Sequence, residues 1–193
     1  GGDNLGRRVA QVEQVTREDR RRPLVLAGFS VGGELVVHTV VSPDLLAGLG
    51  RRPASAVLLS PAVAVRPFSG GDGISRIRAL VHPGGSGGAE PTPAVPLANP
   101  LFAAQLLVRG LWDRQQGFPG DIPLFVATGG AAQDSYVDVD AVRSWTAMLG
   151  RTDRQVTTLA CDEARHAVDN EAWPLGALVR AASTDFLLET LTG

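Results

Sequence analysis

The sequence has no lysine and only one cysteine, Cys161, among its 193 residues. All 18 basic residues are arginines, which indicates a coding bias towards GC-rich codons more than a function. A single cysteine cannot form a disulfide within the chain, so cysteine usage leaves the redox compartment open. No apolar run approaches the ~20 residues that a membrane-spanning helix needs. The sequence therefore offers neither a disulfide framework nor a transmembrane segment.

An excess of charge of either sign is also lacking. With 20 acidic and 18 basic residues the net charge is −2, and no basic stripe is present, so we expect no nucleic-acid partner. The chain begins Gly1-Gly2-Asp3 without a methionine, and no signal peptide is visible. The compartment is left open, with the cytoplasm as the default expectation and the membrane periphery as the alternative. The length suits one domain or slightly more around a single core.

The most informative stretch is the apolar run Leu24–Ala27 followed by Gly28-Phe29-Ser30-Val31-Gly32-Gly33 and a helix-like segment. A serine between such a strand and helix is held on a sharp turn as a nucleophile. We expect the turn to be so crowded that a Cβ at Gly28 or Gly32 would collide with it. We expect Gly33 to let the helix lie close to the sheet. A glycine-rich turn before a helix also suits phosphate binding, which is the alternative.

Apolar and β-branched runs predict four strands, at residues 24–27, 56–59, 122–127 and 154–159. Helical patterns fall at 3–19, from 31 to about 39, at 43–49 after a possible Ser42 cap, at 74–81, at 99–114, up to Gly150, and near the C-terminus. Apolar strands that alternate with helices indicate an α/β fold with a mostly parallel sheet covered on both faces.

Residues 62–121 interrupt this alternation with glycine- and proline-rich loops. Their second helical piece carries an apolar stripe that includes Leu106, Leu107, Leu111 and Trp112. We expect this insertion to form a cap or lid between two parts of the core, residues 1–61 and 122–193. The alternative is that the stripe packs on the core.

Three residues fit the roles of nucleophile, carboxylate and base: Ser30, Asp134 and His166. A serine needs a base, and a neutral histidine serves best when a carboxylate holds its other ring nitrogen. Each residue lies in the loop after a predicted strand. Because such loops gather at one edge of a parallel sheet, we expect the three side chains to meet.

Other residues could take these roles. Asp138 and Asp140 compete with Asp134, although Asp138 stands where a helix N-cap is expected. His38 falls on the helix behind the serine and His82 in the insertion, which favours His166 as the base. Cys161, at the end of an apolar strand, is more typical of a small buried residue than of a thiol nucleophile.

Four segments together resemble a known family. They are Gly28-Phe29-Ser30-Val31-Gly32-Gly33, Ser60-Pro61, Gln133-Asp134-Ser135-Tyr136-Val137-Asp138, and Ala164-Arg165-His166-Ala167-Val168-Asp169-Asn170-Glu171. The chain is similar to the α/β-hydrolase superfamily, within it to the monoacylglycerol lipase and lysophospholipase-like branch. The resemblance implies Ser30 as nucleophile, Asp134 as acid and His166 as base. It also implies the Val31 amide as one donor to the oxyanion, and the insertion as the cap.

The chain departs from that family in two places. The residue before the serine, often histidine in this branch, is Phe29. The family also has several strands before the first helix, and an early His-Gly loop that supplies a second oxyanion donor; neither is present here. The strand that carries Ser30 is apolar on both faces, which suits a central strand. We therefore expect the C-terminal part of a larger fold, completed by a further segment or a partner chain.

The function expected from these residues is hydrolysis of carboxylic esters through an acyl-enzyme, without a metal or organic cofactor. The apolar insertion favours a small-molecule substrate with an acyl chain. One alternative is a non-catalytic ligand-binding protein on the same scaffold. The other is acyl transfer or peptidase action by the same three residues.

Overall fold

The computed structural model describes residues 22–66, 100–134, 136–152 and 154–192. Several expectations fall outside these ranges: the helices at 3–19 and 74–81, His82, and most of the insertion.

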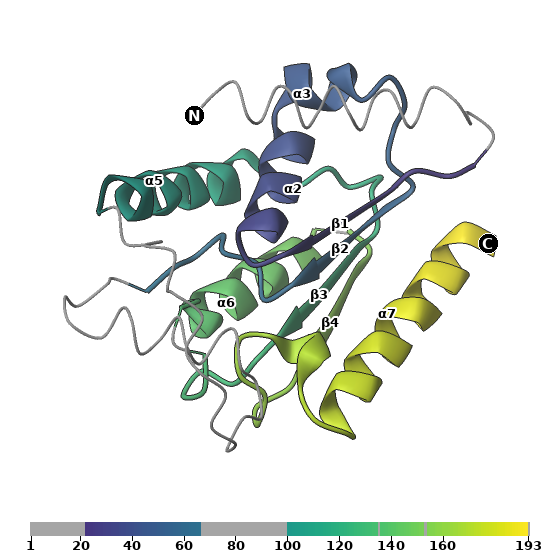
Figure 1. The fold of residues 1–193 in the computed structure, drawn as a ribbon. Helices are drawn as coiled ribbons and strands as arrows, with labels where there is room; N and C mark the ends of the chain where they lie inside the picture. The colour runs from purple at the N-terminus through teal and green to yellow at the C-terminus, as the bar shows by residue number, and fades with distance from the viewer. Residues whose placement is uncertain (1–21, 67–99, 135, 153, 193) are drawn as a thin grey trace, which may run out of the picture.

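The described residues contain a four-stranded parallel sheet, as predicted (Figure 1). Its strands are β1 (Val25–Phe29), β2 (Ser55–Leu59), β3 (Leu124–Thr128) and β4 (Val156–Ala160), and they lie in the order β1-β2-β3-β4. The first strand continues two residues beyond the predicted run because Gly28 and Phe29 pair with Leu58 and Leu59. Ser30 therefore follows the strand directly.

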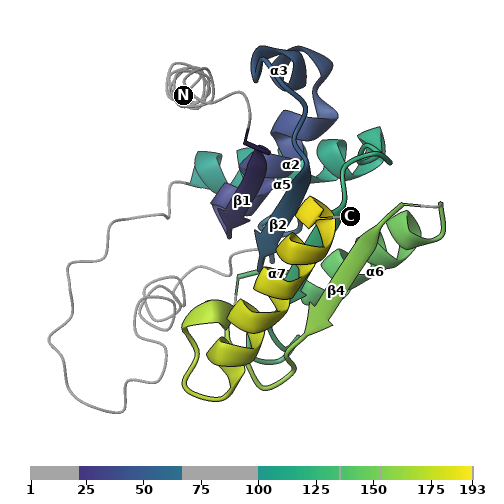
Figure 2. The same cartoon turned by 90° about the vertical axis from the view of Figure 1, so that its right-hand side faces the viewer.

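Six helical segments are described. They are α2 (Val31–Val41), α3 (Pro43–Gly48), α5 (Pro100–Gln116), α6 (Val139–Gly150), the short 3-10 helix η1 (Val168–Asn170) and α7 (Leu175–Thr192). Figures 1 and 2 show α7 on one face of the sheet and α2 and α6 on the other. The sheet is thus covered on both faces, which explains its apolar strands.

Each face of the sheet has its own apolar core. Val37 of α2 and Trp145 of α6 pack with Leu58 and Val126 on one face. Phe186 of α7 packs on the other face, with its ring centroid 5.6 Å from that of Phe125. The central strands β2 and β3 are almost wholly buried, whereas β1 and β4 lie at the edges of the described sheet and are partly exposed.

Helix α5 is the described helix of the insertion, and it packs beside α2 (Figure 1). Its Leu106 is buried against Ala62 and Val65, but Leu111 and Trp112 are exposed. The apolar stripe is therefore divided between packing on the molecule and facing solvent. Within the described ranges, no helix combines the length and apolar character needed to cross a bilayer.

Candidate active site

Ser30 lies at the junction between β1 and α2. Its φ of 53° is one that L-residues rarely adopt, and it turns the chain from strand into helix within one residue. The Ser30 amide donates to the Leu59 carbonyl at 2.9 Å, and its carbonyl accepts from the Ala62 amide at 2.9 Å. The neighbouring strand β2 and the loop after it thus hold the serine in its strained conformation.

The glycines around Ser30 do not share one role. A Cβ at Gly28 would lie 2.4 Å from the Gly32 carbonyl, so only glycine fits at that position. A Cβ at Gly33 would lie 2.9 Å from Pro61, which agrees with close packing of α2. The expectation for Gly32 is wrong, because a Cβ there would meet open space. Gly32 supplies the backbone that a side chain at Gly28 would collide with, while the position of its own Cβ is open.

Asp134 lies in the loop after β3 and is fully buried. Its Oδ1 accepts from the amides of Tyr136 at 2.9 Å and Val137 at 3.0 Å. Arg66 braces this loop, since its side chain donates to the Val137 carbonyl at 3.2 Å and also to the Ala131 carbonyl. The backbone donors to Oδ1 therefore fix the carboxylate independently of its contacts with other side chains.

His166 lies in the loop after β4 and connects the other two residues. Its Nδ1 is 2.8 Å from Asp134 Oδ2, and its Nε2 is 2.8 Å from Ser30 Oγ. The rings of Phe29 and Tyr136 contact the imidazole, with centroids 5.0 Å and 5.1 Å away. The imidazole itself is buried, so its orientation is set by two hydrogen bonds and two aromatic contacts.

Backbone contacts bring the loops of Asp134 and His166 together. The Gly130 amide donates to the Ala164 carbonyl at 2.9 Å, and a Cβ at Gly130 would lie 1.9 Å from the Asp162 carbonyl. Glu171 accepts from the Arg165 amide at 2.7 Å and from the Arg165 guanidinium at 3.2 Å. It fixes Arg165, the residue just before His166, which gives a physical role to the glutamate in the fourth motif.

The competing candidates lie elsewhere. Asp138 caps α6 and accepts from the Ala141 amide at 3.1 Å, as its position predicts, and Asp140 is exposed on that helix. His38 lies on α2 and contacts Asp113. Cys161 is a buried free thiol whose pKa is raised, chiefly by burial, which disfavours a thiolate nucleophile.

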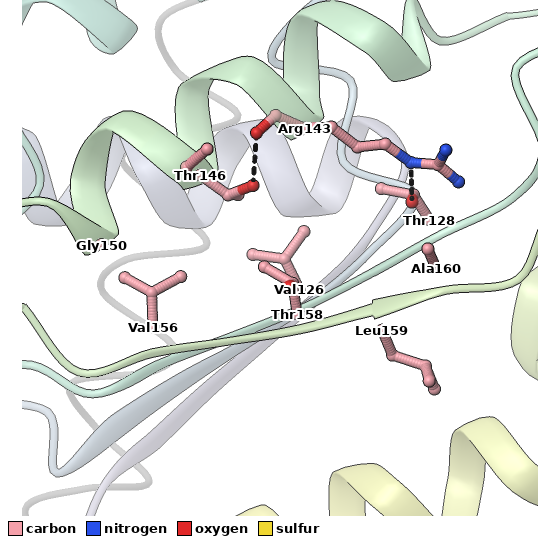
Figure 3. Close-up of a pocket in the computed structure, with 10 residues that line it drawn as sticks. Val126, Thr128, Arg143, Thr146, Gly150, Val156, Thr158, Leu159 and Ala160 are labelled. Carbon is pink, nitrogen blue, oxygen red and sulfur yellow. Dashed lines mark hydrogen bonds between the residues drawn. The ribbon is translucent and has the colours of Figure 1, made fainter.

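A pocket of about 360 Å³ lies between α6 and the outer part of the sheet (Figure 3). Its lining includes Val126, Val156 and Thr158 of the sheet and Thr146 of α6. The Arg143 side chain, at one end, donates to Thr128 Oγ1 at 3.3 Å. Neither Ser30 nor His166 nor Asp134 lines this pocket, so it is distinct from the serine site.

The site joins three side chains of different chemistry. A hydroxyl, an imidazole and a carboxylate form one continuous hydrogen-bonded chain beside the N-terminus of α2. Among the residues that the structure describes, no group of three or more histidine, cysteine or acidic side chains could hold a metal ion.

Sequence reasoning missed the residues that support this site. Arg66 and the Gly130 contact connect segments that are far apart in the sequence. The Gly129-Gly130 pair is visible in the sequence as a turn signal, but the backbone that it faces is not. Glu171 is visible only through the family resemblance.

No family model and no curated protein matches the sequence. The structure is similar to the monoacylglycerol lipase of Paleococcus ferrophilus, with a TM-score of 0.60 and 15% identity, covering 95% of this chain and 75% of the lipase chain. It is also similar to the butyrate-bound esterase Est2 of Thermogutta terrifontis, with a TM-score of 0.59 and 17% identity, covering 94% of this chain and 64% of that chain. An esterase of the bacterial hormone-sensitive lipase family matches with a TM-score of 0.52 and 20% identity, covering 86% of this chain and 53% of that chain.

These likenesses establish the fold, and the parallel sheet covered by helices agrees with them. The chain spans roughly two thirds to three quarters of the lipase and the Est2 esterase, and about half of the third. Over the part that it spans, the chain has the α/β-hydrolase fold.

Proposed function

We propose that this chain carries the catalytic residues of a serine hydrolase that cleaves carboxylic esters through an acyl-enzyme. The observation that supports the proposal most is the hydrogen-bonded chain from Ser30 Oγ through the His166 ring to Asp134 Oδ2, with 2.8 Å at each contact. These distances are within the range for a nucleophile and its base.

In the proposed reaction, Nδ1 of His166 carries a proton and donates to Asp134, which leaves Nε2 free to accept the Ser30 hydroxyl proton. Ser30 Oγ then bonds to the ester carbonyl carbon and forms a tetrahedral oxyanion. His166 returns the proton to the leaving alcohol as the carbon–oxygen bond breaks, which leaves an acyl-serine. Water then attacks the acyl-serine carbonyl carbon while His166 takes a proton from the water. His166 returns that proton to Ser30 Oγ as the acyl bond breaks, which releases the carboxylic acid and restores the hydroxyl.

The Val31 amide is the proposed oxyanion donor. Val31 is the first residue of α2, where N–H groups have no acceptor within the helix and the helix dipole favours negative charge. Removal of one such donor typically costs about 10²–10³ in turnover. The proposal leaves the second donor to a segment outside the described residues or to a partner chain.

A small-molecule ester with an apolar acyl group is the proposed substrate. The similar proteins include a monoacylglycerol lipase and an esterase with bound butyrate, although the identities are only 15–17%. Residues 62–121 are the proposed cap. Leu111 and Trp112 of α5 support this assignment, because they expose apolar surface within that segment. The chemistry requires no metal or organic cofactor.

The test is hydrolysis of p-nitrophenyl esters of increasing acyl length by the full-length protein. We expect a burst of one nitrophenolate per protein followed by slower turnover, the kinetic signature of an acyl-enzyme. Ser30→Ala should lower turnover by at least ~10⁴-fold. Ser42→Ala is the matched control, since Ser42 precedes α3 and makes no side-chain capping bond.

The rival functions give different results. A scaffold that only binds ligands would bind the esters without releasing nitrophenolate. An acyltransferase would transfer the acyl group to an added alcohol or amine in preference to water, and a peptidase would turn over the matching anilide as well as the ester.

A further inference from the structure

Glu34 is a fully buried carboxyl group that the proposed reaction does not use. It lies in the first turn of α2, four residues after Ser30, at the side of α2 that α5 covers. Within the described part of the chain, neither of its carboxyl oxygens has a hydrogen-bond partner. Burying an ionised carboxylate without donors is costly, so such a position favours the neutral acid.

The charged groups that face Glu34 come from α5. Arg109 Nε lies 3.7 Å from Glu34 Oε1, beyond hydrogen-bond distance, and the Arg109 side chain is partly exposed. Asp113, one turn further along α5, is also buried. Both of its carboxylate oxygens lie 3.1 Å from His38 Nδ1, one turn after Glu34 on α2. Two carboxyl groups, one arginine and one histidine thus occupy the contact between the two helices.

This environment changes the protonation of Glu34. Burial raises its pKa from 4.5 to about 7; Arg109 opposes the shift, and the charge of Asp113 and its hydrogen-bonding capacity reinforce it. Near neutral pH, the buried contact therefore changes its charge by one unit.

We propose that Glu34 and Asp113 share one proton and form a pH-responsive latch that holds α5 against α2 while the proton is bound. The protonated Glu34 can donate a hydrogen bond to a carboxylate oxygen of Asp113. After the proton is lost, both carboxyl groups of this buried contact are charged, with the partly exposed Arg109 at 3.7 Å from Glu34 and His38 Nδ1 at 3.1 Å from Asp113.

The latch is connected to the turn that carries Ser30. The Glu34 amide donates to the Ser30 carbonyl at 3.2 Å, so the residue that ionises belongs to the same helical turn as the serine. Nevertheless, the latch does not depend on Ser30 being a nucleophile. Its direct effect is on how firmly α5 is held, which can be measured without any substrate.

The sign of the pH effect follows from the direction of the shift. The folded state binds the Glu34 proton more tightly than the unfolded chain, so the contribution to stability is complete below the unfolded value of 4.5. It declines as the pH rises and is lost once the pH passes about 7. From pH 5 to pH 9, this one group should raise the unfolding equilibrium constant by about 100-fold.

The experiment measures denaturant unfolding of the full-length protein from pH 5 to pH 9, together with hydrogen–deuterium exchange of the α5 amides corrected for intrinsic rates. Glu34→Gln keeps the shape and the donor but cannot ionise. We expect it to remove the 100-fold decline and to keep α5 protected at high pH. Asp44→Asn, at an exposed carboxylate on α3, is the matched control and should leave the pH dependence unchanged.

A second variant keeps the test decisive if Glu34→Gln does not fold. Asp113→Asn removes the facing negative charge, so the decline in stability should move to lower pH. The proposal is overturned if Glu34→Gln keeps the wild-type pH dependence, or if Asp113→Asn leaves the midpoint of the decline unchanged. Unfolding and exchange require no catalysis, so failure of the ester hydrolase proposal would be seen separately.

Discussion

Asp134 and Glu34 are both fully buried carboxyl groups, but they differ in the hydrogen-bond donors that surround them. The Asp134 carboxylate contacts two backbone amides and the His166 ring, all within 3.0 Å. Glu34 has an arginine nitrogen at 3.7 Å and no hydrogen bond from the described residues.

The difference arises from where each residue lies in the fold. Asp134 is in a loop after a strand, where the following amides are not used by a helix or sheet and can turn towards the carboxylate. Glu34 is in a helix, its own amide is engaged with the Ser30 carbonyl, and the described charged groups that face its carboxyl group are side chains of α5. The loop thus stabilises the charge of Asp134 with backbone donors, whereas the charge state of Glu34 depends on the side chains of the neighbouring helix.

The largest expected effect tests the loop side of this comparison. Asp134→Asn keeps the size of the side chain but replaces an acceptor by an amide, which disfavours the histidine tautomer that can accept the serine proton. We expect ester turnover to fall by about 10⁴-fold with little change in KM. Asp138→Asn, at the N-cap of α6, is the matched control and should leave turnover within a few-fold of wild type.

The same replacement of a carboxyl group by an amide should be favourable at Glu34, where the measured quantity is stability. Above pH 7, Glu34→Gln is expected to stabilise the protein, because it removes a buried charge that lacks donors. The corresponding gain in the unfolding free energy is about 2 to 3 kcal/mol larger at pH 9 than at pH 5, and it vanishes below pH 4.5. Destabilisation at both pH values would show that the two buried acids do not differ in the way described.

The smallest effects concern the turn between β1 and α2, which lies between the two acids. Gly28→Ala should destabilise the fold by about 1–3 kcal/mol, because its Cβ would lie 2.4 Å from the Gly32 carbonyl. Gly32→Ala should stabilise the protein by a few tenths of a kcal/mol to about 1 kcal/mol, since the position is helical and open. Thermal unfolding of the two variants measures the difference; equal effects would contradict the described packing.

Much of the architecture is predictable from the sequence because its cause is local. The apolar runs predict all four strands, and loops after parallel strands gather at one edge, which brings Ser30, Asp134 and His166 together. The sequence also distinguishes Asp138 from Asp134, because Asp138 stands directly before a predicted helix, and Asp138 does cap α6.

The parts that sequence reasoning missed depend on contacts between distant segments. Which glycine of the serine turn is crowded depends on how α2 leaves the strand, and here Gly28 is crowded while Gly32 is not. Glu34 lies on a helix of the core and Asp113 on the described helix of the insertion, and no local pattern marks either residue as buried. Periodicity predicts faces of helices, but it does not predict which faces meet.

The most direct measurement of the central claim is covalent labelling of the full-length protein with a fluorophosphonate, followed by peptide mass analysis. We predict one label per protein, located on Ser30, and its loss in His166→Ala while the variant remains folded. A folded wild-type protein that takes up no label, or a label that persists without His166, would contradict the account.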